Sequence, residues 1–356
     1  MYLCGMNNGR LRYGLIWIIW GVISCSPPPA HPVSTGMYYW KTRFILQEEE
    51  QKYLKDCKVQ RLFVKFADIA VHPVSGTVEP LSLLNIQDTT GTGHREVIPC
   101  FFITNEVFLQ LTEAQTIWLS DRIMETLESV GAGFNRTPEQ WKEIQFDCDW
   151  TSSTRASYFA FLKQMRRKLP DVALSATIRL HQYKNPRLTG VPPVQRGTLM
   201  CYNTGDIDAP LPHNSILGVE EAEKYLTPPA HYPLPLDLAL PIFSWAPVYR
   251  EDHLWRIIPD PDPMAWNDSS RFDRSENQIT VKAATFVGGH YLSPGDLVRI
   301  EAVTPELLFQ MVPLLRQTDL APDAGILFYH LDTNTLRNFS PVQIQRLCDT
   351  LAQHEN

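Results

Sequence analysis

The sequence has no excess of basic residues and, after its N-terminal segment, no long apolar run. Its 39 acidic residues outnumber its 32 lysines and arginines, which gives a formal net charge of -7. Binding to a phosphate backbone needs clustered lysine and arginine, so this balance argues against a nucleic-acid partner. A transmembrane helix needs about 20 consecutive apolar residues, and no such run follows the first 24 residues.

The cysteines do not form a regular framework either. Two of the seven lie at positions 4 and 25, and the others occupy positions 57, 100, 148, 201 and 348. The number of these others is odd, and three lie in apolar, strand-like runs. We therefore expect buried thiols that pack as small apolar groups, rather than disulfides. No cysteine–histidine spacing indicates a zinc site, and no motif indicates a cofactor.

The N-terminal segment has the features of an export signal. Arg10 and Arg12 are its charged residues, and an apolar stretch at 15–23 follows them. This stretch is about half as long as a membrane-spanning helix. It ends in Val22-Ile23-Ser24-Cys25, which resembles the lipobox of bacterial lipoproteins. In that family the cysteine receives acyl chains such as palmitate and becomes the mature N-terminus. A plain secretory signal or an N-terminal membrane anchor is the alternative.

The lipobox divides the chain into three predicted parts. Residues 1–24 form a signal peptide, residues 25–36 a proline-rich tether that cannot be helical, and residues 37–356 one folded domain. Removal of the signal peptide takes away two positive charges, so the net charge changes from -7 to -9. The resemblance implies a protein held by its lipid in the cell envelope, at the outer membrane or on the periplasmic face.

Eight apolar segments, mostly separated by helical ones, follow the tether. They occupy residues 38–44, 61–68, 97–103, 143–149, 173–180, 198–203, 237–245 and 325–331. Each is apolar enough to be a strand buried on both faces. Eight such units predict a (β/α)8 TIM barrel in a single domain. A doubly wound open sheet is the alternative, and the lack of a glycine fingerprint after the first strand argues against it.

One segment interrupts this alternation. Residues 247–302 follow the seventh predicted strand and contain Pro-Asp-Pro-Asp-Pro at 259–263. The length and the prolines predict an insertion that serves as a lid or rim. Because the insertion follows the carboxyl end of a strand, we expect it over the C-terminal mouth of the barrel, with Trp255 or Trp266 near the cleft.

Polar and aromatic side chains gather where the predicted strands end, which is where the active site of such a barrel lies. The candidates for substrate binding are Lys65, Asp68, Trp150, Arg179, His181, Tyr202, Asn203, Trp245, His330 and Asp332. The candidates for catalysis are Asp147 and Asp149, which point to the same side of one strand, about 7 Å apart. Two carboxylates this close should differ in pKa, one ionised and one partly protonated. The alternative is a buried charge ladder with Lys65 or Arg179 that serves structure alone.

Two of these segments resemble motifs of the family 18 chitinase-like barrels. Phe146-Asp-Cys-Asp-Trp-Thr151 is similar to the family's Asp-x-Asp-x-Glu, and Met200-Cys-Tyr-Asn203 is similar to its Met-x-Tyr-Asp. The resemblance implies that Asp147 and Asp149 match the motif aspartates. It also implies that Tyr202 matches the tyrosine that helps to hold the substrate's N-acetyl group.

The chain departs from these motifs at two positions. Thr151 stands where the family has its catalytic glutamate, and Asn203 stands where it has an aspartate. Because a threonine cannot protonate a glycosidic oxygen, the family's substrate-assisted hydrolysis does not carry over. The pattern from Tyr38-Tyr-Trp-Lys to Tyr329-His-Leu-Asp is closer still to a group of uncharacterised bacterial barrel lipoproteins.

Three kinds of function remain open from the sequence. The first is a glycoside hydrolase-like enzyme that pairs Asp147 or Asp149 with a carboxylate from another strand end. The candidates for that partner are Asp332, Asp206 and Glu251. The second is a carbohydrate-binding barrel without activity, which the missing glutamate favours over a chitinase. The third is a structural or assembly lipoprotein. The nine tryptophans favour a carbohydrate partner, because sugar-binding clefts use flat apolar faces.

Overall fold

The computed structural model describes residues 34–109, 111–209, 213–227, 231–275, 278–332 and 336–353. The predicted signal peptide, the lipobox cysteine Cys25 and most of the predicted tether therefore lie outside the described residues. The first strand begins at Ser34, so residues 34–36 belong to the folded part of the chain rather than to a tether.

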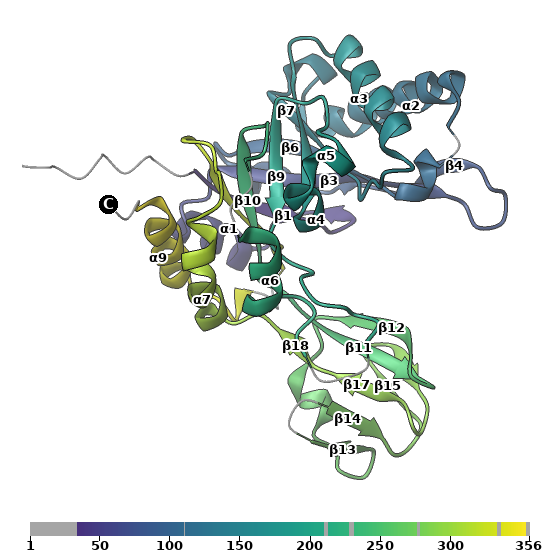
Figure 1. The fold of residues 1–356 in the computed structure, drawn as a ribbon, viewed down its shortest axis with the longest axis vertical. Coiled ribbons are helices and arrows are strands. Elements are labelled where there is room, and N and C mark those ends of the chain that lie inside the picture. Colours follow the sequence, from purple (N-terminus) through teal and green to yellow (C-terminus); the bar gives the residue numbers. More distant parts are fainter. Residues whose placement is uncertain are drawn as a thin grey trace, which may run out of the picture.

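Eight parallel strands close into a barrel (Figure 1). They are β1 (Ser34–Tyr39), β3 (Arg61–Val71), β6 (Glu96–Ile103), β7 (Glu143–Asp147), β8 (Ala173–Arg179), β9 (Arg196–Met200), β10 (Leu236–Pro241) and β19 (Gly325–Tyr329). The strand β1 pairs with both β3 and β19, which closes the barrel. The predicted TIM barrel is confirmed, and closure excludes the open sheet.

Helices surround most of the barrel. They are α1 (Glu48–Asp56), α2 (Glu113–Gly131), α3 (Arg155–Lys168), α4 (Leu180–Lys184), α5 (Pro186–Thr189), α6 (Val219–Leu226), α7 (Pro305–Leu315) and α9 (Pro341–Ala352). Side-chain caps fix several of their starts: Thr112, Thr304 and Ser340 each accept a hydrogen bond from the backbone three residues on. Between β3 and β6 the chain instead forms β4 (Val78–Leu83), antiparallel to β3, and β5 (Asn85–Ile86), which pairs with β2 (Arg43–Phe44).

The chain between β10 and α7 folds as a separate antiparallel sheet. Its strands are β11 (Ser244–Arg250), β12 (His253–Pro259), β13 (Phe272–Arg274), β14 (Gln278–Val281), β17 (Leu297–Arg299) and β18 (Glu301–Ala302), with a hairpin of β15 (Thr285–Val287) and β16 (His290–Leu292). It has its own apolar cluster, which includes Trp266. Figure 1 shows that this sheet projects from the barrel. Of the two tryptophans expected near the cleft, Trp266 is buried inside the insertion and Trp255 is exposed.

Buried ion pairs occupy the end of the barrel where the strands begin. Arg61 contacts Glu143 at 2.5 Å and Asp237 at 2.8 Å, and Arg196 contacts Asp237 at 2.8 Å. Asp237 is fully buried and also accepts a hydrogen bond from the backbone of Gly325. Losing one member of such a network would leave an uncompensated buried charge. This network is structural, and it lies at the end opposite to the strand ends where the candidate site residues gather.

Two expectations about composition can be compared with the structure. The five cysteines in the described residues are buried and free, as predicted. No helix in the described part of the chain is both long and apolar enough to cross a membrane.

Candidate functional site

A pocket of about 310 Å³ opens where the barrel strands end. Its lining residues are Trp40, Phe102, Asp147, Arg179, Met200, Tyr202, Asn203, Phe243, Ser244, Trp245, Pro259, Asp260, Tyr329 and His330. The strands or the loops just after them supply most of this set, and the base of the insertion supplies one wall. Pro259 and Asp260 of the insertion therefore lie at the mouth of the barrel. Trp245, expected at the end of the seventh strand, instead belongs to β11, because β10 already ends at Pro241.

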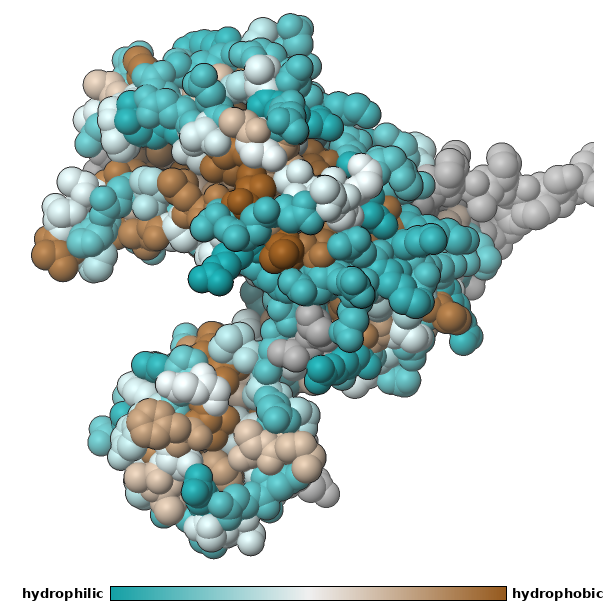
Figure 2. All heavy atoms as spheres, turned by 180° about the vertical axis from the view of Figure 1, so that it is seen from behind, coloured by the Kyte–Doolittle hydropathy of each residue, from teal (hydrophilic) through white to brown (hydrophobic). Residues whose placement is uncertain are grey.

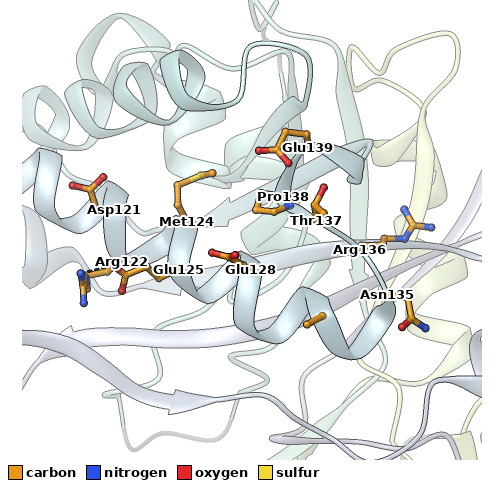
Figure 3. Close-up of a pocket in the computed structure, with 11 residues that line it drawn as sticks. Asp121, Arg122, Met124, Glu125, Glu128, Asn135, Arg136, Thr137, Pro138 and Glu139 are labelled. Atoms are coloured by element: carbon orange, nitrogen blue, oxygen red, sulfur yellow. Dashed lines mark hydrogen bonds and ion pairs between the residues drawn. The ribbon is translucent and has the colours of Figure 1, made fainter.

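A larger hollow of about 820 Å³ lies elsewhere, on the outside of the barrel. Figure 3 shows that its side chains come from α2 and from the loop that follows it, with acidic and basic groups mixed. That loop leads into the start of β7, so it lies at the end of the barrel opposite to the mouth. None of the predicted site residues lies there. The pocket at the strand ends is therefore the candidate site.

Asp147 is the last residue of β7, and its carboxyl group is buried, with 7% of the residue exposed. Thr177, on the neighbouring strand β8, donates a hydrogen bond from its hydroxyl to Oδ1 of Asp147 at 2.6 Å. Burial, together with the negative charge of Asp149, raises the pKa of Asp147 to about 6. A carboxyl group in this environment keeps its proton well above the pH at which an exposed aspartate loses it.

Asp149 has a different environment: it lies in the loop after β7 and is not among the residues that line the pocket. Its side chain is 43% exposed, and Arg179 holds it through two hydrogen bonds, one of them from Nη2 to Oδ2 at 2.5 Å. Such a bidentate contact between a guanidinium and a carboxylate is a charge-assisted hydrogen-bonded pair. The guanidinium of Arg179 also opposes the rise in the pKa of Asp147. The two aspartates therefore form one buried, proton-holding group and one ion-paired group.

Aromatic rings form the walls around Asp147. The rings of Tyr202 and Tyr329 are stacked with centroids 5.6 Å apart, and Phe243 meets both edge-on. Trp40 packs against Tyr329 at 5.5 Å, and Trp245 packs against Phe243 at 5.4 Å. Flat rings beside a few polar groups are the kind of lining that receives the apolar face and the hydroxyl groups of a sugar.

Asp260 is a second carboxylate in the pocket, and the sequence analysis missed it. It follows β12, and its Oδ2 lies 4.0 Å from Nε2 of His330. Burial raises the pKa of Asp260, with the charge of His330 opposing, and burial lowers the pKa of His330. Its position inside Pro-Asp-Pro-Asp-Pro is typical of a loop, and although the insertion was expected over the barrel mouth, no local pattern singled out Asp260 as the carboxylate that reaches the pocket.

The carboxylates expected as catalytic partners do not line the pocket. Asp332 lies 3.4 Å from the ammonium group of Lys41. Asp206 is exposed in the loop after β9, and Glu251 is exposed in the turn between β11 and β12. Asp260 takes the place expected for them.

Other predicted site residues lie beside the pocket or away from it. Lys65 forms an ion pair with Asp68 at 2.8 Å, and its ammonium group lies 5.5 Å from the ring centre of Trp40. Lys65 therefore packs against a ring of the pocket wall without lining the pocket itself. His181 is exposed in α4. The structure does not bring Trp150 to the pocket, because its ring is fully buried and its N–H donates to the backbone oxygen of Thr189 at 2.9 Å.

Thr151, at the position of the chitinase-like family's acid, is exposed. Its hydroxyl group lies 2.7 Å from that of Ser153, within the turn before α3. In the described part of the chain no cluster of histidine, cysteine, aspartate or glutamate is arranged to hold a metal ion.

No protein-family model matches this chain, and no curated protein matches it in sequence. Solved structures do match. The chitinase of Chromobacterium violaceum ATCC 12472 is similar over 91% of this chain and 100% of its own, with 10% identity and a TM-score of 0.52. The likeness is one of fold. The spore cortex-lytic enzymes SleL of Bacillus cereus and Bacillus megaterium QM B1551 are 15% and 12% identical, with TM-scores of 0.48 and 0.49. They match over 89% and 90% of this chain and over 74% and 75% of theirs.

Proposed function

We propose that the barrel mouth binds a carbohydrate and that Asp147 is the proton donor of a glycoside hydrolase-like reaction there. One observation carries this proposal: a buried carboxyl group with a raised pKa lies in a pocket walled by aromatic rings. Cleavage of a glycosidic bond needs an acid that is still protonated when the sugar binds. The likeness in fold to a chitinase is consistent with a carbohydrate ligand.

In this reaction each acidic group has one task. Asp147 donates its proton to the glycosidic oxygen as the bond between that oxygen and the sugar carbon breaks. Asp260, which enters from the insertion, is the second carboxylate, and it accepts a proton from the water that adds to the sugar carbon. The negative charge of Asp149 favours the protonated form of Asp147, and Arg179, which is ion-paired with Asp149, opposes this effect.

A carbohydrate-binding barrel without activity is the second candidate. The observation that favours it is Thr151, which replaces the family's acid and is held within its own turn. The aromatic pocket would serve such a binding protein equally well.

The proposal extends to the anchor, which rests on the lipobox at Cys25. β1 starts at the end of the barrel opposite to the mouth. A lipid-bearing segment that enters there would leave the mouth facing away from the membrane, toward a glycan in the cell envelope.

The test compares Asp147→Asn with wild type on a panel of chito-oligosaccharides, peptidoglycan, xylan and mannan. The substitution keeps the volume of the side chain and removes its proton, so turnover should fall by about two orders of magnitude or more while glycan binding persists. Asp349→Asn is the matched control, because Asp349 is exposed on α9. Binding without turnover in wild type would select the second candidate. Neither binding nor turnover on the whole panel would contradict both.

A further inference from the structure

Asp260 and His330 reach the pocket from different parts of the molecule. Asp260 follows β12 of the insertion, His330 follows β19 of the barrel, and both line the pocket. Figure 2 shows a deep indentation between the insertion and the barrel. The contact of 4.0 Å between Oδ2 of Asp260 and Nε2 of His330 is one of those that join the two parts.

The backbone holds Asp260 in this position. Its N–H donates to the backbone oxygen of Ser244 at 3.0 Å, and its Oδ1 accepts a hydrogen bond from the N–H of Ser244 at 3.4 Å. Ser244 begins β11, where the insertion leaves the barrel. Oδ1 is therefore occupied by the backbone, and Oδ2 is the oxygen that His330 faces.

Charged groups of the barrel continue from His330 with alternating sign. Asp332 acts on His330 from the loop after β19, and its carboxylate lies 3.4 Å from the ammonium group of Lys41. Lys41 in turn contacts the buried carboxylate of Glu50 at 2.5 Å. Acidic and basic groups thus alternate from Asp260 to Glu50, and His330 has an acidic neighbour on each side.

Asp260 also borders a second cavity, of about 560 Å³, outside the pocket of the candidate site. The charged residues that share this cavity with Asp260 are Asp262, Glu306 and Arg337. The charged groups with the largest effects on the pKa of Asp260 lie on the barrel side instead: His330 lowers it and Asp332 raises it. His330 is therefore the basic partner of Asp260.

Burial acts on both members of this pair. It raises the pKa of Asp260 and lowers the pKa of His330, so each group is disfavoured in its charged form. The opposite charges of the two groups counteract these shifts, because each charge stabilises the other. A proton on such a pair belongs to both groups rather than to one. The imidazole of His330 is neutral at neutral pH, so it can accept a proton.

We propose that His330 is the positioning residue of Asp260 and that Asp260 passes to it the proton taken from water. This inference rests on the proposed function. The water oxygen bonds to the sugar carbon while one of its O–H bonds breaks, and the proton goes to Asp260 and then from Oδ2 to Nε2 of His330. Asp260 is then a carboxylate again. The imidazolium, which Asp260 and Asp332 stabilise, returns the proton to solvent.

The first test of this pair needs no glycan. The C2 proton of the His330 imidazole is followed by NMR against pH in wild type, Asp260→Asn and Asp349→Asn, and its signal is identified by its loss in His330→Gln. Without the negative charge of Asp260, the midpoint of this titration should move to lower pH by about half a unit or more. Asp349→Asn should leave it in place, because Asp349 is exposed on α9. An unchanged midpoint in Asp260→Asn would overturn the inference.

The second test measures turnover against pH on the glycan that the panel identifies. A base has to be deprotonated to act, so the ascending limb of the profile follows Asp260. His330→Gln removes the charge that lowers the pKa of Asp260, so this limb should move to higher pH. Turnover should fall by about tenfold with glycan binding little changed. His253→Gln is the matched control, since His253 is exposed at the other end of β12.

The outcomes separate the role of His330 from the proposed function. An ascending limb that stays in place in His330→Gln, or equal changes in His330→Gln and His253→Gln, would overturn the role of His330 and leave the proposed reaction intact. If wild type turns over no glycan of the panel, the proposed reaction fails, and the role of His330 in it fails as well. A shifted NMR midpoint would in that case show an ion pair that serves structure alone.

Discussion

At the scale of single residues, the pair of aspartates shows how position determines chemistry. Asp147 ends a buried strand and faces a hydroxyl group, whereas Asp149 lies in the following loop and meets a guanidinium. Desolvation disfavours the charged form of the first, whereas the second is partly exposed and forms an ion pair. Two identical side chains, two positions apart, thereby lie in different environments.

This difference predicts how activity depends on pH. Because the pKa of Asp147 is about 6, the proton that it donates is lost as the pH rises through about 6. We expect the turnover of wild type to fall above this pH, in a profile measured on the glycan that the panel identifies. In Asp149→Asn the neighbouring negative charge is gone, so the descending limb should shift to lower pH. An unchanged descending limb in that variant would contradict this account.

Stability should depend on pH through the same residue, and the sign follows from the direction of the shift. The folded pKa of about 6 is above the ordinary value of 3.8, so the folded state holds the proton more tightly. Asp147 therefore lowers the free energy of unfolding as the pH rises between these values, by about 3 kcal/mol in all. Asp147→Asn should gain stability relative to wild type over this interval in denaturant titrations. Asp349→Asn should show no such trend.

At the scale of elements, one carboxylate joins the insertion to the barrel. Glu301 of β18 accepts hydrogen bonds from the backbone of Ser215 at 2.7 Å and from the indole of Trp245 at 2.9 Å. It also forms a buried ion pair with Arg299 at 2.6 Å. Glu301 thus connects the loop after β9 with β11 and β17, and it fixes the orientation of a ring in the pocket wall.

Glu301→Gln should therefore weaken the contacts between the insertion and the barrel, and it should also loosen the Trp245 ring in the pocket wall. The substitution removes the negative charge that the buried guanidinium of Arg299 faces, so the free energy of unfolding should fall by about 3 kcal/mol or more. Tryptophan emission should change as well, because Trp245 loses a charged acceptor. The comparison is Glu125→Gln, whose ion pair with Arg122 is exposed and should contribute little. Equal stability of the two variants would show that Glu301 does not stabilise the contact between the insertion and the barrel.

At the scale of the whole molecule, the barrel has two ends with different roles. Buried ion pairs occupy the end where the strands begin, and the aromatic pocket, with its two acidic groups, occupies the end where they finish. The described chain enters at the first end through β1, and the insertion leaves from the second. If Cys25 carries the proposed lipid and the pocket binds the proposed glycan, this arrangement suits a protein that works on material beyond the membrane surface.

The anchor itself is open to a direct test. If Cys25 carries the lipid, Cys25→Ala should move the protein from the detergent phase to the aqueous phase in a phase-partition assay. Mass spectrometry of wild type should then find acyl chains on an N-terminal cysteine. A mature N-terminus at another residue, without acyl mass, would contradict the lipoprotein proposal.

The sequence by itself determined the barrel. Eight apolar segments separated by helices have few ways to bury both faces, and a closed parallel barrel is one of them, so each predicted strand appears in its predicted order. Strand alternation predicted both aspartates on one side of the strand, but β7 ends at Asp147 and Asp149 lies in the loop that follows.

Only the tertiary structure decided what surrounds those aspartates. Asp260 lies more than a hundred residues from Asp147, and its approach depends on a sheet whose pairing no local pattern specifies. Trp150 looked like a sugar-binding ring because it follows the motif, yet it turns into the core, where Thr189 satisfies its N–H. Local periodicity fixes which face of an element is apolar. Which side chains from distant elements share a pocket depends on how those elements pack, and that is a property of the whole fold.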